Sequence, residues 1–277
     1  MMERGPRSGG LFFGADVNSH PIAVFDSGLG GLTVLHALRG RLPHEDFFYF
    51  ADTRYLPYGD KPVVFLRERG VAIARALAER GAKALVIACN TATAMAAEAI
   101  RAATALPVVA LEPGVKPAVA KTRSGVVGVM ATVRTLESER FMRLVGNHGG
   151  STRVIPQACP GLADAIEQYG QHSAQVGALL DRFVAPLADA GADVLVLGCT
   201  HYPWVADAIA ARMPADTQIL DTGEAVARQL ERLLLAANLQ GGGSGRLTVS
   251  TSGSPQSVAA TVDRLWGQHL PVQHWEP

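Results

Sequence analysis

The sequence predicts an α/β protein with two pseudo-symmetric domains, each a mostly parallel sheet flanked by helices. Three observations predict this fold. Short apolar runs typical of buried strands alternate with helical segments along the chain. Two of these runs, residues 84–88 and 194–197, each follow a Gly-Ala pair and each lead into a cysteine. The composition is 48% hydrophobic and 18% charged, which suits a sizeable core. Since open α/β sheets bind ligands at their carboxyl edges, we expect Cys89 and Cys199 in a cleft between the domains.

Composition and charge exclude several classes of protein. Lys+Arg and Asp+Glu are both 25, so the net charge is zero with neutral histidines, and neither nucleic acid nor a membrane surface is an expected partner. No apolar run reaches the ~18–20 residues that span a bilayer. Three cysteines make no disulfide framework and no zinc spacing, which favours a cytoplasmic protein without a metal. Residues 1–20 are too weakly apolar for a signal peptide, and we expect a flexible N-terminal extension.

The first strand is predicted at residues 22–25, before the glycine-rich turn 26–31 and a helix that starts at Leu32. The turn has two interpretations. Unpaired N–H groups at the helix start make an anion site, or the glycines only allow a tight turn with positive φ. Asp26 is likewise either a functional residue or a helix cap.

The rest of the first half continues in βα order. We expect a strand at 47–50, a helix at 62–80, the strand that ends at Cys89, a helix at 91–105 and a strand at 107–110. Pro57 and Gly59 mark a loop after the second strand. That loop either covers a site or is a surface connection.

The second domain is predicted to begin after Glu112. We expect a strand at 124–130, centred on 126–130, a helix at 135–146, a strand at 152–155, a helix at 174–190 and the strand that ends at Cys199. Residues 219–221 are predicted as a strand that returns to the first domain, followed by a helix at 223–238, a flexible linker at 241–245, a strand at 247–251 and a last helix at 255–267. The first domain is therefore 21–112 plus 221–277, and the second is 113–220. Glu112 and Asp221 mark the hinges.

The two cysteines at strand ends favour catalysis over packing. A single buried cysteine is more often a small hydrophobic residue. Here two cysteines occupy equivalent places, each precedes a predicted helix N-terminus that stabilises a thiolate, and each precedes hydrogen-bonding side chains. Cys159 precedes Pro160 without such neighbours, so we interpret it as structural.

Four chemistries fit thiols in general. A cysteine hydrolase needs one thiol with a histidine base, which His201 could supply to Cys199. A redox dithiol normally uses CxxC, and a metal site needs more ligands. Proton transfer on opposite faces of one carbon needs two acid/base groups, one protonated and one not. Two equivalent thiols meet that last need directly, and we find no lysine motif for pyridoxal phosphate, so no cofactor is expected.

Four motifs then resemble a known family. They are VFDSGLGGLTV (24–34), DTRYLPYG (52–59), ACNTA (88–92) and GCTHYP (198–203). In this order they resemble the glutamate racemases, which belong to the cofactor-independent, two-cysteine aspartate/glutamate racemases. The resemblance implies that Cys89 handles the α-proton on the D-isomer side and Cys199 on the L-isomer side. It also implies that D-glutamate is made for peptidoglycan synthesis.

The resemblance further implies roles for the neighbouring residues. Asp26 assists Cys89, whereas His201 and Glu167 assist Cys199. The implied substrate contacts are Asp26, Ser27, Pro57, Tyr58, Gly59, Asn90, Thr91, Thr132, Thr200 and His201. Ala131 stands where the family pattern has glycine. We expect a homodimer.

Two other functions remain open at this point. One is a related racemase or decarboxylase with another acidic substrate, although a decarboxylase would need only one of the two cysteines. The other is a regulatory role, because some members of the family bind DNA gyrase. The zero net charge gives that role no support.

Overall fold

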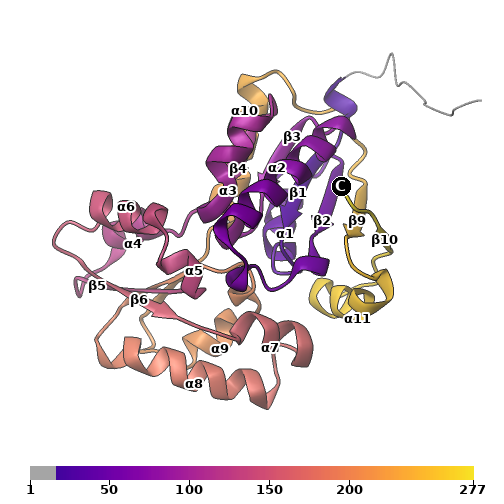
Figure 1. Ribbon diagram of the computed structural model, residues 1–277. Helices are drawn as coiled ribbons and strands as arrows, with labels where there is room; N and C mark the ends of the chain where they lie inside the picture. The colour runs from indigo at the N-terminus through magenta and orange to yellow at the C-terminus, as the bar shows by residue number, and fades with distance from the viewer. Residues whose placement is uncertain (1–16) are drawn as a thin grey trace, which may run out of the picture.

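Two separate parallel sheets organise the computed structural model, which describes residues 17–277 (Figure 1). The first has six strands in the order β10-β9-β2-β1-β3-β4, and the second has four in the order β6-β5-β7-β8. The strands of the first sheet are β1 Ile22–Asp26, β2 Phe47–Ala51, β3 Ala84–Ile87, β4 Val108–Ala110, β9 Leu247–Thr251 and β10 Val272–His274. Those of the second are β5 Val126–Ala131, β6 Arg153–Ala158, β7 Val194–Leu197 and β8 Gln218–Leu220.

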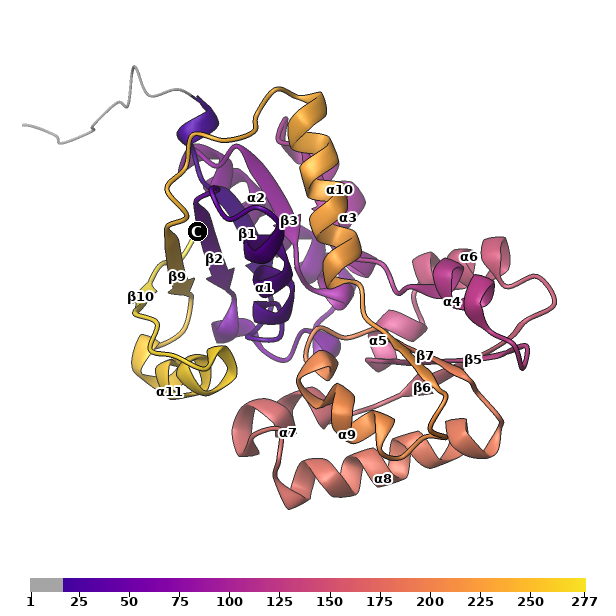
Figure 2. The same ribbon diagram turned by 180° about the vertical axis from the view of Figure 1, so that it is seen from behind.

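Helices cover both faces of each sheet (Figures 1 and 2). Around the first sheet lie α1 Leu32–Arg41, α2 Val63–Glu79, α3 Asn90–Ala103, α10 Gly223–Ala236 and α11 Pro255–Trp266. Around the second lie α4 Val115–Lys121, α5 Val133–Leu136, α6 Glu139–His148, α7 Leu162–Tyr169, α8 Ala174–Asp189 and α9 Ala206–Ala210. Successive side chains of each strand point to opposite faces of its sheet and so pack against different helix layers. Val24 packs in the core layer that contains α1 and α10, whereas its neighbour Phe25 packs in the layer of α2 and α3.

The chain crosses between the sheets twice, between β4 and α4 and between β8 and α10. Residues 219–221 were expected to return to the first domain as a strand, and this is wrong. β8 pairs with β7 in the second sheet, so the chain returns only after Leu220. The carboxyl ends of β1, β3, β5 and β7 therefore lie near these crossings (Figure 2). This arrangement brings the two sheets together at the edges where parallel strands present their ligand-binding loops.

Three other expectations about local structure are corrected. The single helix expected at 135–146 is two helices, because Ser138 interrupts it and its side chain caps α6 by accepting the Phe141 N–H. β10 was not predicted, since three residues with two exposed positions carry no pattern. Residues 17–20 were expected to be part of a flexible extension, yet they include a 3-10 helix, Val17–Ser19. The remainder of that extension, residues 1–16, lies outside the described residues.

Segment 241–245 is not the flexible linker that its glycines predict. The Gly241 N–H donates to Glu45 and the Ser244 N–H to Asp46, both at 2.8 Å. Lys83 lies buried beneath it and donates to Glu45 at 2.5 Å and to the Gly241 carbonyl at 3.1 Å. Buried carboxylates thus fix this backbone through contacts almost 200 positions apart in the sequence, which no local pattern reports.

Among the described residues, no helix is both long and apolar enough to cross a membrane. Residues 17–277 also contain no group of three or more histidine, cysteine, aspartate or glutamate side chains arranged to hold a metal ion.

Candidate active site

A cavity of about 270 Å³ lies where the two sheets meet. Its volume is near the lower end of the range for small-molecule sites, which suits a ligand of few atoms. The predicted site residues that line it are Ser27, Pro57, Tyr58, Gly59, Cys89, Asn90, Thr91, Thr132, Glu167, Cys199, Thr200 and His201. Cys89 follows β3 in one sheet and Cys199 follows β7 in the other, so the cavity receives one thiol from each. The structure thereby brings together side chains that lie far apart along the chain.

Cys89 is the N-cap of α3. Its sulfur accepts the Ala92 N–H at 3.3 Å and lies 3.3 Å from the Ser27 hydroxyl. Burial, and next the negative charge of Asp26, raise the pKa of Cys89 to about 12 in spite of these two hydrogen bonds. The helix N-terminus was expected to favour the thiolate, but desolvation outweighs it. Cys89 therefore carries its proton at neutral pH.

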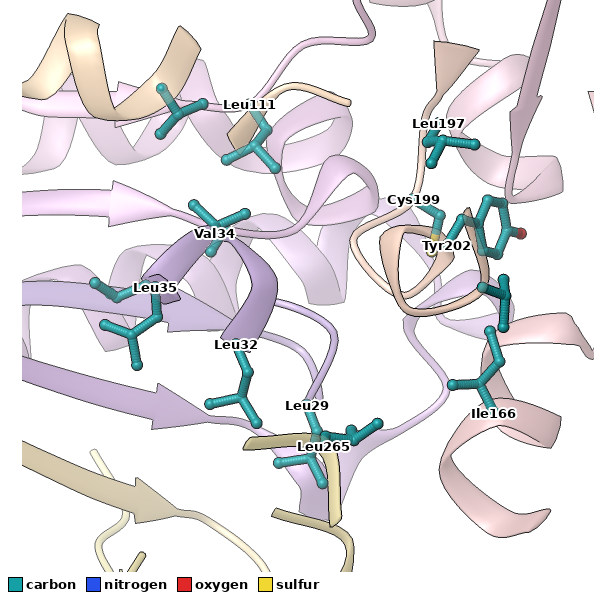
Figure 3. Packing of buried hydrophobic residues seen from close by; sticks show 14 of the residues in the cluster. Leu29, Leu32, Val34, Leu35, Leu111, Ile166, Leu197, Cys199, Tyr202 and Leu265 are labelled. Carbon is teal, nitrogen blue, oxygen red and sulfur yellow. The ribbon is translucent and has the colours of Figure 1, made fainter. Parts of the chain in front are cut away.

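Cys199 has a different environment. No long helix follows it, because a 3-10 turn, Tyr202–Val205, and the five-residue α9 come next. Its sulfur lies instead 3.6 Å from His201 Nδ1. Figure 3 shows Cys199 beside Tyr202 and Leu197 at the edge of the large core cluster. The thiol expected to match Cys89 thus faces an imidazole rather than a helix N-terminus.

His201 and Glu167 form a buried pair, with Nε2 and Oε1 2.6 Å apart. Burial lowers the pKa of His201, but its hydrogen bonds with Cys199 and Glu167 raise that pKa well above its usual value. Burial raises the pKa of Glu167, and the hydrogen bond from His201 outweighs it, so the net direction is downward. A raised pKa of His201 and a lowered pKa of Glu167 are both expected for an imidazolium paired with a carboxylate. An imidazolium at this place can stabilise negative charge on the Cys199 sulfur.

The glycine-rich turn after β1 packs tightly against this pair. The Leu29 N–H donates to Glu167 Oε1 at 2.9 Å. A Cβ on Gly30 would lie 2.5 Å from His201 Nδ1 and 2.6 Å from the Thr200 hydroxyl, and one on Gly28 would lie 2.8 Å from Glu167. Neither glycine has a positive φ. These glycines are therefore needed for close approach to Glu167, Thr200 and His201, a reason that neither interpretation of the turn from sequence included.

Asp26, an expected substrate contact, is not among the residues that line this cavity. Its carboxylate is fully buried behind the wall and accepts the N–H groups of Ser27 at 2.8 Å and Gly31 at 2.7 Å. Tyr49 also donates to it at 3.3 Å. Burial raises the pKa of Asp26. Asp26 thus fixes the turn that precedes α1 by accepting the Gly31 N–H, and its charge acts on Cys89 through space.

Sequence reasoning missed three ionisable residues in the cavity wall, Asp60, Arg134 and Asp164, and assigned a fourth wall residue, Cys159, a structural role only. Arg134 Nε donates to the Gly59 carbonyl at 3.3 Å and so connects α5 to the loop after β2. Burial raises the pKa of Asp164. Asp164 lies three positions before Glu167 on α7, and this helical spacing is the signal that could have found it. Cys159, interpreted as structural, is buried at the end of β6.

Hydroxyl groups near the cavity also connect the two halves of the molecule. Thr91 lies 3.0 Å from the Thr132 hydroxyl, which lies 2.9 Å from that of Thr135. Thr33 donates to the Thr200 carbonyl at 3.0 Å. The cavity therefore offers two thiols, a charged histidine–glutamate pair and several neutral donors. Such a set can hold a small anionic molecule while protons move to and from it.

Known proteins resemble this chain along most of its length. A model of the Asp/Glu/Hydantoin racemase family matches residues 67–230. The glutamate racemase of Pseudomonas aeruginosa strain PAO1 is 48% identical over 91% of this chain and 96% of its own. Glutamate racemase of Francisella tularensis in complex with D-glutamate has a TM-score of 0.82 at 27% identity, covering 94% and 98% of the two chains. Escherichia coli glutamate racemase with L-glutamate and an activator has a TM-score of 0.81 at 28% identity, covering 92% and 97%.

Proposed function

The chain belongs to the Asp/Glu/hydantoin racemase family, and we propose that it interconverts L- and D-glutamate by moving the α-proton between two thiols. The observation that carries this proposal is the placement of Cys89 and Cys199 in one cavity, each at a strand end of a different sheet. The close relationship to glutamate racemases supports glutamate as the substrate.

The unequal environments of the thiols support a division of labour. From L-glutamate, Cys199 acts as the base, helped by the imidazolium of His201 at 3.6 Å. Cys89, whose pKa burial raises to about 12, then delivers its proton to the opposite face. The Cα–H bond breaks toward Cys199 as the new bond forms from Cys89, and the two protonation states exchange. From D-glutamate the same steps run in reverse, so Cys89 must first lose its proton.

The substrate carries two carboxylates, which need several donors inside a small cavity. Ser27, Asn90, Thr91, Thr132 and Thr200 supply hydroxyl and amide groups around it. Fixed donors also stabilise the negative charge that develops when the α-proton leaves. Asn90 is buried, and its side-chain oxygen has no partner among the described residues, so this acceptor is available to a donor on the ligand, such as the substrate ammonium group.

Thermodynamics limits how the difference between the two thiols can show in the kinetic constants for L- and D-glutamate. Substrate and product are enantiomers, so the equilibrium constant in an achiral solvent is one. The two values of kcat/KM must therefore be equal at every pH. The difference between Cys89 and Cys199 is expected in kcat and KM separately, and in which enantiomer each enzyme form binds.

In the cell we propose that this enzyme is cytoplasmic and homodimeric, uses no cofactor, and supplies D-glutamate for peptidoglycan synthesis. Size-exclusion chromatography with light scattering tests the dimer.

The experiment that tests the function measures circular dichroism of the purified enzyme with L- or D-glutamate, with aspartate as the comparison and no pyridoxal phosphate added. Cys89→Ser and Cys199→Ser are each expected to lower kcat by at least about 10³-fold. Cys159→Ser is the comparison variant: the proposal gives Cys159 no proton to transfer, so its kcat should fall far less than that of either catalytic variant. In D₂O, product formed early from L-glutamate should carry deuterium at Cα while unreacted L-glutamate does not. Wild-type turnover of aspartate alone, or full activity in both serine variants, would overturn the proposal.

A further inference from the structure

The loop that follows β2 forms one wall of the cavity, through Leu56, Pro57, Tyr58, Gly59 and Asp60. Only short 3-10 turns, Thr53–Tyr55 and Tyr58–Asp60, stiffen it internally. A loop of this kind does not hold its own position, because it lacks a continuous backbone ladder. Side-chain contacts from elsewhere in the chain must therefore fix it.

A buried ion pair holds Tyr58 from behind. Arg69 on α2 donates to both oxygens of Asp52, at 2.9 and 2.7 Å, and the Tyr58 hydroxyl donates to the same carboxylate at 2.6 Å. Asp52 is fully buried, and the Arg69 side chain is 9% exposed. The single hydroxyl proton of Tyr58 is thus committed to Asp52 rather than to a ligand. This pair sets the position of Tyr58 within the cavity wall.

The carboxyl-terminal part of the chain holds the first half of the loop. Residue Thr53 shares a 2.6 Å hydrogen bond with Thr251, and the Arg54 N–H donates to Ser252 at 3.1 Å. The Glu276 carboxylate then accepts two hydrogen bonds, one from the Arg54 guanidinium at 2.7 Å and one from the Tyr55 hydroxyl at 3.1 Å. Three consecutive loop residues are therefore tied to segment 251–276.

Aromatic packing fixes Glu276 itself. The Trp275 ring meets Phe50 edge-on at 4.8 Å and Phe48 at 5.4 Å, both on β2. The Arg69 guanidinium lies 4.5 Å from the centre of the Tyr55 ring. Tyr55 thereby touches both holding groups, Glu276 through its hydroxyl and Arg69 through its ring. The two sets of contacts form one network around the loop.

We propose that Glu276 and the Arg69–Asp52 pair are positioning residues, which hold loop 53–60 so that Tyr58 and Gly59 are in place before the substrate enters. This rests on the proposed function. A pre-organised loop binds its ligand without the free-energy cost of ordering. Loss of Glu276 is therefore expected to weaken substrate binding and to leave the thiol chemistry intact.

The test compares Glu276→Ala with Glu231→Ala. Glu231 on α10 accepts from Arg41 at 2.6 Å and is 30% exposed, against 28% for Glu276. It is therefore a matched ion pair whose residues do not line the cavity. Glu276→Ala should raise KM for both enantiomers by about 2- to 10-fold, with kcat within about twofold of wild type. Glu276→Gln keeps one acceptor oxygen and should give an intermediate KM. Glu231→Ala should change neither constant.

Hydrogen exchange separates this inference from the proposed function, since it needs no turnover. Amides of residues 53–61 should exchange faster in Glu276→Ala than in wild type or Glu231→Ala. If the wild type fails to racemise glutamate, the proposed function fails and the exchange rates still decide the positioning role. Unchanged exchange in Glu276→Ala, a fall in kcat without a change in KM, or equal effects in Glu231→Ala would each overturn the inference.

Discussion

Gly30→Ala is expected to lower kcat by about 10²-fold by adding one methyl group outside the cavity-lining residues. The new Cβ would lie 2.5 Å from His201 Nδ1, 2.6 Å from the Thr200 hydroxyl and 2.7 Å from His201 Cε1. Ordinary contacts begin near 3.4 Å, so His201 must move by about 1 Å. That movement separates Nδ1 from the Cys199 sulfur, which now lies at 3.6 Å, and strains the 2.6 Å bond to Glu167.

The magnitude follows from these contacts. A misplacement of about 1 Å in a catalytic group costs about 10²-fold in rate. Overpacking costs about 1–3 kcal/mol, less than the ~5–15 kcal/mol by which a typical domain is stable, so the variant should still fold. The expected result is a 10²-fold lower kcat with glutamate, measured by circular dichroism, and a free energy of unfolding lowered by about 1–3 kcal/mol in urea.

Gly40→Ala is the matched control. Gly40 lies near the end of α1, and a Cβ there meets nothing within 4 Å. Alanine should stabilise the helix by about 0.5–1 kcal/mol and leave kcat unchanged. A Gly30→Ala enzyme with wild-type kcat would refute the assignment of these glycines to close approach.

Two further predictions concern stability. Lys83→Ala leaves Glu45 buried without its cation, which lies 2.5 Å away. In urea titrations this variant should lower the free energy of unfolding by about 3–5 kcal/mol. Arg123 forms an exposed ion pair, so Arg123→Ala should change the free energy of unfolding by less than about 1 kcal/mol. A Lys83→Ala variant as stable as the wild type would contradict this. The His201–Glu167 pair predicts that the stability of the protein depends on pH. The pKa of His201 is raised, so its contribution to the free energy of unfolding is complete below pH 6.5, its ordinary pKa, and is lost as the pH rises through the raised pKa. The pKa of Glu167 is lowered, so its contribution to the free energy of unfolding is complete above pH 4.5 and is lost as the pH falls through the lowered pKa. The difference in Tm between wild type and Glu167→Gln should therefore be largest between pH 4.5 and 6.5, and a difference that does not vary with pH would contradict the ion pair.

Much of the fold could be read from local patterns. The apolar runs before Cys89 and Cys199 are β3 and β7, and the helices at 62–80 and 174–190 agree with α2 and α8 to within a residue. The α/β class with parallel sheets is confirmed by the strand pairing and by the likeness to glutamate racemase structures. These features depend on neighbouring residues, and so the chain carries their signals locally. Segment 241–245 shows the limit, because its carboxylate partners lie almost 200 positions earlier.

By itself, the sequence determined which side chains reach the carboxyl ends of the strands, since an apolar run with the right period ends where the cysteine begins. Only the tertiary structure decided how those side chains behave. It buried Asp26 behind the cavity wall and raised the pKa of Cys89 to about 12, whereas it paired Cys199 with His201 and Glu167. The physical reason is that desolvation and charge depend on what surrounds a group in space. Two thiols that look equivalent in the chain therefore have different partners in the fold.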